Sequence, residues 1–224
     1  MPGESTLPAP PAAERANLWA VCISQFLVLG GMTAVLPLLP LYLQQIGIVE
    51  AEPLRWWTGA LGAAPFLVAV FATPVWGAMA DRVGHKPMVI RSLVGIGAAS
   101  VGMGLVTGPW ALLGFRAVQG AVSGVFPAAV GLLTASTGEA RVGRALALLR
   151  AARSLGALSG PLLGGLAADF IGIRPLFFFV GVFGFSMALV SAVVVREAVR
   201  PVRRAGAPPP LGWGALVRRR RIWT

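Results

Sequence analysis

The chain has 224 residues, of which 56% are hydrophobic and only 12% are charged, and its formal net charge is +11. A soluble domain carries about twice that charged fraction, so the composition excludes an ordinary water-soluble domain. The positive charge does not indicate nucleic-acid binding, because it gathers at the ends of long uncharged stretches. The single cysteine, Cys22, lies inside an apolar stretch, which excludes an intrachain disulfide and a cysteine-based metal cluster.

The first 16 residues are rich in proline and alanine and carry acidic residues, which predicts a disordered cytosolic tail rather than a basic, cleavable signal peptide. The stretches that follow are long enough to cross a bilayer, which takes about 20 apolar residues. We therefore predict an all-α integral membrane protein, with residues 17–195 forming a six-helix transmembrane bundle. The predicted helices are residues 17–44, 55–80, 87–106, 109–134, 144–169 and 173–195.

Residues 196–224 are predicted to form a basic, proline-rich cytosolic linker and a segment that lies at the membrane surface, because four consecutive arginines there are flanked by apolar and tryptophan residues. Basic residues are placed asymmetrically between the two sides of the membrane. The segments on one side hold only Arg55 and Arg174. The segments on the other side hold Arg15, Arg82, Lys86, Arg91, Arg141, Arg144, Arg150, Arg153 and the basic C-terminal residues. The positive-inside rule then predicts that both termini are cytosolic. The excess of arginine over lysine indicates a GC-rich bacterial genome, so we expect a multi-pass protein of the bacterial plasma membrane.

A charged turn lies between the second and third predicted helices. Its residues are Gly77, Asp81, Arg82, Gly84 and Lys86. The pattern returns between the fifth and sixth helices, at residues 161–175, after an odd number of spans, so the two turns face opposite sides of the membrane. This predicts two inverted three-helix repeats, the internal symmetry of secondary transporters. The alternative is that the two turns are similar without common ancestry. Glycine permits backbone conformations that a short turn needs, and proline is favoured at the start of the next helix, so the pattern suits any such turn.

Small residues and one buried charge mark the fifth and fourth helices. Gly156, Gly160 and Gly164 recur every four residues, which predicts a smooth stripe for close helix packing. Pro161 and Gly165 lie beside that stripe, and the proline predicts a kink. Arg116 follows the start of its helix by seven residues, roughly 10 Å deep at ~1.5 Å per residue. A charge at that depth indicates a functional site, unless the side chain reaches back to the headgroups.

Taken in this order, these elements resemble the major facilitator superfamily over residues 17–224. The turn from Gly77 to Lys86 resembles its motif A, and Arg116, Gln119 and Gly120 resemble its motif B. The stripe of Gly156, Gly160, Pro161, Gly164 and Gly165 resembles motif C, which marks the branch of drug:proton antiporters. The first helix is similar to that branch in Gly30, Pro37, Pro40, Leu41 and Tyr42.

The resemblance implies an exporter of drugs or other small molecules, driven by protons, without a cofactor, in which two six-helix bundles rock about a central cavity. It implies that Asp81 and Arg82 latch the bundles at the cytosolic side, with Gly84 permitting the turn and Lys86 joining the charge network. It further implies that Arg116 tunes a proton carrier from the cavity wall and that the fifth-helix stripe forms a hinge between bundles. Plausible substrate-lining residues are Gln25, Met32, Phe66 and Phe126.

Two departures from the family pattern matter. The first four helices contain no acidic residue except Asp81 at a helix end, so a proton-carrying carboxylate must be Asp169 or come from elsewhere. Arg116 and Arg153 without a buried acid favour an anionic or zwitterionic cargo. The second departure is length, because six helices make one bundle of two. The other bundle would come from a second chain or a homodimer, and the alternative is a truncated fragment or assembly partner that transports nothing alone.

An intramembrane serine protease would also suit six helices, but it needs Gly-x-Ser on one helix and a histidine on another. Ser123 is preceded at that spacing by Ala121, and the only histidine, His85, is predicted to be an exposed turn residue. The pattern therefore predicts no enzyme activity.

Overall fold

The computed structural model describes residues 11–196. The predictions for residues 1–10 and 197–224, which concern the tail, the linker and the surface segment, lie outside the described residues. Within residues 11–196 there are six helical spans long and apolar enough to cross a membrane, so the predicted six-helix architecture is confirmed. The spans are α1 (Ala12–Val35), η1 (Leu36–Leu38) and α2 (Leu39–Gln45); α3 (Ala51–Val83); α4 (His85–Leu105); α5 (Pro109–Ala121) and α6 (Val125–Ser136); α7 (Glu139–Ile171); and α8 (Ile173–Val194).

Most helix ends that differ from the prediction extend beyond it, whereas α4 and α8 each end one residue earlier than predicted. α1 begins at Ala12, so residues 12–16 are helical instead of belonging to the tail, and α3 and α7 extend beyond both predicted ends. The reason is that a helix needs no apolar residues once it leaves the hydrocarbon layer. Glu14 and Arg141 illustrate this, because they form an ion pair of 2.9 Å between the first turns of α1 and α7.

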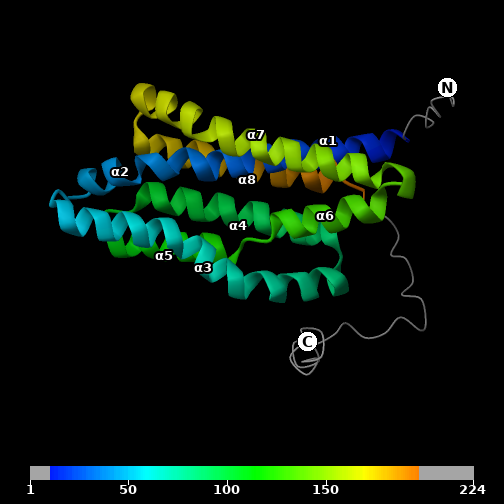
Figure 1. Ribbon diagram of the computed structural model, residues 1–224, viewed down its shortest axis with the longest axis horizontal. Coiled ribbons are helices and arrows are strands. Elements are labelled where there is room, and N and C mark those ends of the chain that lie inside the picture. Colours follow the sequence, from blue (N-terminus) through cyan, green and yellow to red (C-terminus); the bar gives the residue numbers. More distant parts are fainter. Residues whose placement is uncertain (1–10, 197–224) are drawn as a thin grey trace, which may run out of the picture.

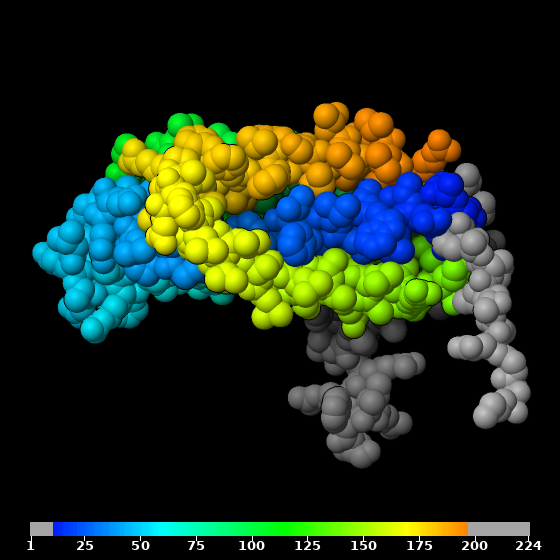
Figure 2. Space-filling model, turned by 90° about the horizontal axis from the view of Figure 1, so that it is seen from above, coloured from blue at the N-terminus to red at the C-terminus, as the bar shows by residue number. Residues whose placement is uncertain are grey.

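The packing of the spans follows the repeat. α1 packs most extensively against α7, α4 against α8, and α3 against α5, and Figure 1 shows these neighbours running side by side. The repeat exchanges the first, second and third spans with the fourth, fifth and sixth. It therefore maps the contact between the first and fifth spans (α1–α7) onto the contact between the fourth and second spans (α5–α3). The contact between the third and sixth spans (α4–α8) maps onto itself. The space-filling view shows α7, α1 and α8 forming one face together (Figure 2).

The two repeated turns share one backbone geometry. Gly84 joins α3 to α4 with φ 110° and ψ 160°, and Gly172 joins α7 to α8 with φ 88° and ψ 166°. The N–H of Gly84 donates to the carbonyl of Ala80 at 2.9 Å, and the N–H of Gly172 donates to that of Ala168 at 2.8 Å. Side chains rarely adopt a positive φ, so glycine is required at both places. The two connections lie at opposite ends of the bundle (Figure 1), as inverted repeats demand.

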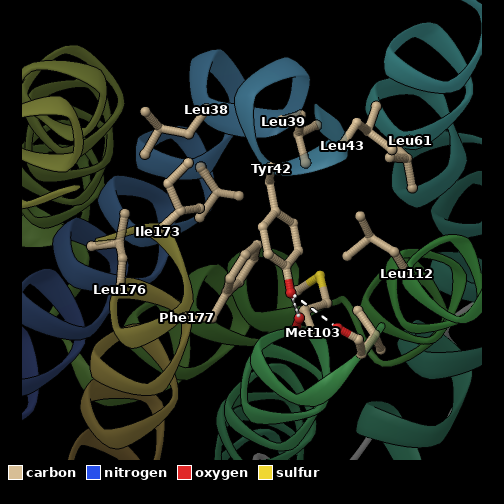
Figure 3. Close-up of a cluster of buried hydrophobic side chains, with 12 residues drawn as sticks. Leu38, Leu39, Tyr42, Leu43, Leu61, Met103, Leu112, Ile173, Leu176 and Phe177 are labelled. Carbon is tan, nitrogen blue, oxygen red and sulfur yellow. Dashed lines mark hydrogen bonds between the residues drawn. The ribbon is translucent and has the colours of Figure 1, made fainter. Parts of the chain in front are cut away.

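A buried cluster closes the end of the bundle that we predict to face outside. Figure 3 shows Tyr42 of α2 directed into this cluster, where its hydroxyl donates to the carbonyl of Met103 at 2.8 Å. The ring of Tyr42 lies 5.1 Å from that of Phe177, centroid to centroid. The cluster draws its side chains from α2, α3, α4, α5 and α8. A single aromatic residue therefore ties the broken end of the first span to both repeats.

α3 and α7 leave a large apolar surface uncovered. Both are the least buried of the spans, although their exposed side chains are as apolar as those of a core. Examples are Phe66, Phe71, Val75, Leu155, Leu158, Leu162, Leu166 and Phe170.

Candidate functional site

The fourth span is interrupted at the middle of the bundle, where the sequence predicted one continuous helix over residues 109–134. α5 ends at Ala121 and α6 begins at Val125. Gly124 has φ 120°, a left-handed conformation that ends the hydrogen-bond ladder. Pro127 lies in the first turn of α6, where the N–H groups have no intrahelical partner and a proline costs little. The prediction of an unbroken helix was wrong because hydropathy, on which it rests, continues through the break, and only the positive φ of Gly124 ends α5 before α6.

The interruption frees backbone carbonyls, and side chains from α3 and α4 satisfy them. The indole Nε1 of Trp76 donates to the carbonyl of Ala121 at 2.6 Å. The Nη2 of Arg91 donates to the carbonyls of Val122 at 3.3 Å and Ser123 at 3.2 Å. Unsatisfied carbonyls inside a membrane are costly, so these donors stabilise the interruption of the helix.

The break opens onto a cavity of about 270 Å³ between α1, α3, α5, α6 and α7. Its wall includes all the residues predicted to line a substrate site and all three motif B residues. These are Gln25, Met32, Phe66, Phe126, Arg116, Gln119 and Gly120. Phe66 is 65% exposed, so its side chain stands at the open side of the cavity.

Arg116 is directed into the bundle interior instead of reaching back to the headgroups. Its side chain is only 1% exposed, and its Nη1 donates to Oε1 of Gln119 at 3.0 Å. Its Nε and Nη2 are buried and have no partner among the described residues. A buried guanidinium with two unpartnered donors is costly in free energy.

A second guanidinium enters the cavity from α7. The Nη1 of Arg153 donates to Oε1 of Gln25 at 3.3 Å, and its guanidinium carbon lies 4.7 Å from the ring centroid of Phe126. Gln25 is fully buried, and its Nε2 has no partner among the described residues. The cavity wall therefore presents two cations and an idle amide donor.

Among residues 11–196, no acidic side chain lines this cavity. Asp169 lies near the C-terminal end of α7, outside this cavity, where it lines a separate hollow with Leu41 and Gln44. Among the described residues there is also no group of three histidine, cysteine or acidic residues that could hold a metal ion. The cavity therefore carries positive charge from Arg116 and Arg153, and the rest of its wall is largely apolar.

The motif A residues lie at the end of the bundle where α3 meets α4. Asp81 and Arg82 are exposed, as a latch to another bundle would require. The Nζ of Lys86 is already engaged, since it donates to the carbonyl of Ala192 on α8 at 2.7 Å. A Cβ at Gly77 would meet nothing within 4 Å, so no close packing requires glycine there.

The motif C stripe packs inside this bundle. A Cβ at Gly156 would overlap the carbonyl of Phe26, and one at Gly160 would overlap Thr33 and the carbonyl of Gly30. Gly164 meets α1 in the same way, at Ala34. Pro161 is exposed, and a Cβ at Gly165 would meet nothing within 4 Å. The three glycines thus fit α7 against α1, while Pro161 and Gly165 lie away from that contact.

His85 differs from the prediction of an exposed turn residue. It is the first residue of α4 and is partly buried, and a Cβ at Gly131 of α6 would overlap its ring. The reason is that the α3–α4 connection is a single residue, Gly84, which brings the first turn of α4 directly against α6. Gly120 makes a similar close contact with the backbone of Pro65. In the sequence each of these contacts is marked only by a single glycine, Gly131 or Gly120. A glycine alone does not show which residue packs against it.

Comparisons with known proteins agree with this architecture. Residues 21–224 match the sequence profile of the Major Facilitator Superfamily. The multidrug resistance protein MdtG of Dickeya zeae (strain Ech586) is 38% identical over 192 residues, which are 86% of this chain and 47% of the relative. MdtG of Proteus mirabilis (strain HI4320) is 36% identical over 193 residues, 86% of this chain and 48% of the relative. The chain thus spans about half the length of the curated relatives it matches.

Solved structures show the same fold. A bacterial homolog of the human lysosomal transporter Spinster, inward-facing and unoccupied, superimposes with a TM-score of 0.75 at 19% identity, over 94% of this chain and 49% of that structure. The human organic anion transporter MFSD10 (TETRAN) gives 0.73 at 22% identity, over 86% of this chain and 49% of that structure. Together with the six spans and the repeated turns, these matches show that the chain belongs to the Major Facilitator Superfamily, a family of membrane transporters and not of enzymes.

Proposed function

We propose that the chain forms one six-helix half of an efflux transporter that exports drugs or other small molecules across the bacterial plasma membrane in exchange for protons. The observation that carries this proposal is the cavity at the interrupted fourth span, with Arg116 buried in its wall. The name of the relatives, multidrug resistance protein, supports export over uptake. Both termini are proposed to be cytosolic, from the placement of basic residues.

The cavity is completed by a second six-helix bundle, supplied in another chain or by a second copy of this one. The uncovered apolar sides of α3 and α7 support this part of the proposal, as does the exposure of Asp81 and Arg82. The proton-carrying carboxylate is assigned to the second bundle, because Asp169 lies at the far end of α7 and outside the cavity. A fragment or assembly partner that transports nothing alone is the alternative.

The cargo is proposed to carry an anionic or zwitterionic group. Arg116 offers two idle donors, and Arg153 adds a second positive charge. The start of α6 adds to this field, because Gly124 to Pro127 line the cavity and the first N–H groups of a helix carry partial positive charge. Half-helix N-termini serve anionic substrate groups in transporters with broken helices.

A chimera tests the proposed export. The N-terminal half of the Dickeya relative is replaced by this chain, and the fusion is expressed in a drug-sensitive bacterium beside this chain alone. The expected result is drug resistance with the chimera that a protonophore abolishes. A chimera that inserts into the membrane at the level of its parent and gives no resistance would overturn the proposal. Equal resistance from this chain alone would identify the partner bundle as a second copy.

A further inference from the structure

A second cavity lies at the end of the bundle where α1 and α7 begin. It holds about 340 Å³ and shares no lining residue with the cavity at the fourth span. Its wall comes from the first turns of α1 and α7 and from the residue that follows α6. The lining residues are Glu14, Arg15, Leu18, Trp19, Thr137, Ala140, Arg141, Arg144, Ala145 and Leu148.

The rim of this second cavity has an excess of positive charge. Arg141 binds Glu14 through two hydrogen bonds, Nε to Oε1 at 3.0 Å and Nη2 to Oε2 at 2.9 Å, which cancels one pair of charges. Arg15 and Arg144 are exposed, and neither side chain makes a hydrogen bond or ion pair with another residue of the range 11–196. Two guanidinium groups are thus available to an anion at the rim.

Backbone and hydroxyl donors reinforce that charge. α7 begins at Glu139 after Gly138, which provides no side-chain cap, and Ala140 of its first turn lines the cavity. The N–H groups of a first turn bind phosphate readily. Thr137 lines the same cavity and is only 8% exposed, and its hydroxyl is buried with no partner among the described residues. A buried, idle hydroxyl beside a helix start independently indicates a missing hydrogen-bonding ligand.

The remaining wall is apolar and open to the membrane. Trp19 is 59% exposed and Leu148 is 40% exposed, and both lie about one turn deeper than the arginines on their helices. Tryptophan favours the boundary between headgroups and hydrocarbon. The order along each helix is therefore cation first and apolar side chain next, which matches a phosphate joined to an acyl chain.

We propose that this second cavity binds an anionic phospholipid of the leaflet that faces the N-terminus. Its phosphate lies between Arg15, Arg144 and the start of α7, with the Thr137 hydroxyl as a further donor, and one acyl chain lies along Trp19 and Leu148. Basic hollows between membrane helices are suited to lipid headgroups on the cytosolic side. The site is independent of the transported cargo and of any second bundle.

Native mass spectrometry of the purified full chain tests the site, with phosphatidylglycerol and phosphatidylcholine as probes. Wild type is expected to retain phosphatidylglycerol more tightly. The double variant Arg15→Gln/Arg144→Gln should bind it about thirtyfold more weakly, since each of the two arginines near a headgroup contributes about 1 kcal/mol. The control Arg55→Gln/Arg150→Gln removes the same charge from exposed positions outside the cavity and should leave binding unchanged. Equal weakening in both double variants would refute a specific site.

Fluorescence provides a measurement that needs no charge variant. Brominated phosphatidylglycerol should quench wild-type tryptophan emission more than brominated phosphatidylcholine does, and the difference should vanish in Trp19→Phe. Inorganic phosphate should not relieve the quenching, because it lacks the acyl chain. Relief by phosphate at concentrations comparable to the lipid would show a simple anion site and overturn the lipid assignment, as would identical quenching by the two lipids.

Discussion

The guanidinium carbon of Arg91 lies 3.4 Å above the ring centroid of Trp76, so a cation from α4 is stacked on an aromatic ring from α3. Both side chains also donate to the carbonyls at the interruption of the fourth span, and Arg91 donates in addition to the hydroxyl of Ser92 at 2.8 Å. The stacking orients the guanidinium, and the carbonyls stabilise its charge by accepting hydrogen bonds. The pair therefore joins α3 and α4 of the first repeat to the broken helix of the second.

Trp76→Phe should destabilise the bundle by about 1–3 kcal/mol, because the carbonyl of Ala121 loses its donor in a partly buried position. Thermal unfolding of the purified protein in detergent measures the effect. Trp56→Phe is the matched control, since Trp56 is 77% exposed on the same helix. Equal melting temperatures for the two variants would show that the indole donor does not hold the break.

Gly160→Ala should destabilise the bundle by about 1–3 kcal/mol, the usual cost of overpacking. The added methyl group would overlap Thr33 and the carbonyl of Gly30, and backbone cannot move aside cheaply. Gly165→Ala, on the same helix, meets nothing within 4 Å and should be neutral or stabilising. Unfolding of the two variants side by side tests the contact, and the reverse order of stability would contradict it.

The six spans could be predicted from hydropathy because the bilayer dictates the length of an apolar helix. The charged ends could not, since Glu14 and Arg141 extend α1 and α7 through a contact between residues far apart in sequence. Gly84 and Gly172 were predictable as a pair, because a positive φ at a one-residue connection accepts little else. Local backbone demands are thus readable from sequence, whereas contacts between helices are not.

The candidate cavity shows the same division. Arg116 could be identified as a candidate from the sequence, because a charged residue inside a membrane span is costly and indicates a functional site. Arg91 did not, because it lies close to the predicted cytosolic turn and was counted among the basic residues of that side. Its partner Trp76 had no visible signal, as tryptophan is common in membrane helices. The break at Gly124 did have one, the proline three residues later, but helix-interior prolines at Pro65 and Pro74 leave α3 continuous.

Arg116→Met should weaken binding of acidic cargo without weakening the fold. Loss of a charged hydrogen bond costs about 1.5–3 kcal/mol, or tenfold and more in affinity. Removing a buried charge that makes a single hydrogen bond should leave stability unchanged or raise it by about 1–4 kcal/mol. Binding of a fluoroquinolone, which has a carboxylate, and of ethidium, which has none, to the purified chimera measures the first effect.

Arg150→Gln is the control for that experiment, because Arg150 is exposed on α7 outside the cavity. It should leave the affinity for both ligands unchanged, whereas Arg116→Met should lower the affinity for the fluoroquinolone alone. A loss of ethidium binding as large as the loss of fluoroquinolone binding would assign Arg116 to the structure of the cavity and not to recognition of an anion.

Asp81→Asn should abolish resistance conferred by the chimera and leave the stability of the isolated six-helix chain within about 0.5 kcal/mol of wild type. The reason is that Asp81 is exposed and its side chain makes no hydrogen bond or ion pair with another described residue, so its proposed contact lies in the other bundle. Gly84→Ala is the contrasting variant, because φ 110° with ψ 160° is a conformation that strains any side chain, and it should cost about 1–3 kcal/mol in the isolated chain. Drug susceptibility and thermal unfolding, measured on both variants, separate the latch from the turn. Asp81→Asn that unfolds the isolated chain, or that leaves resistance intact, would exclude the proposed latch.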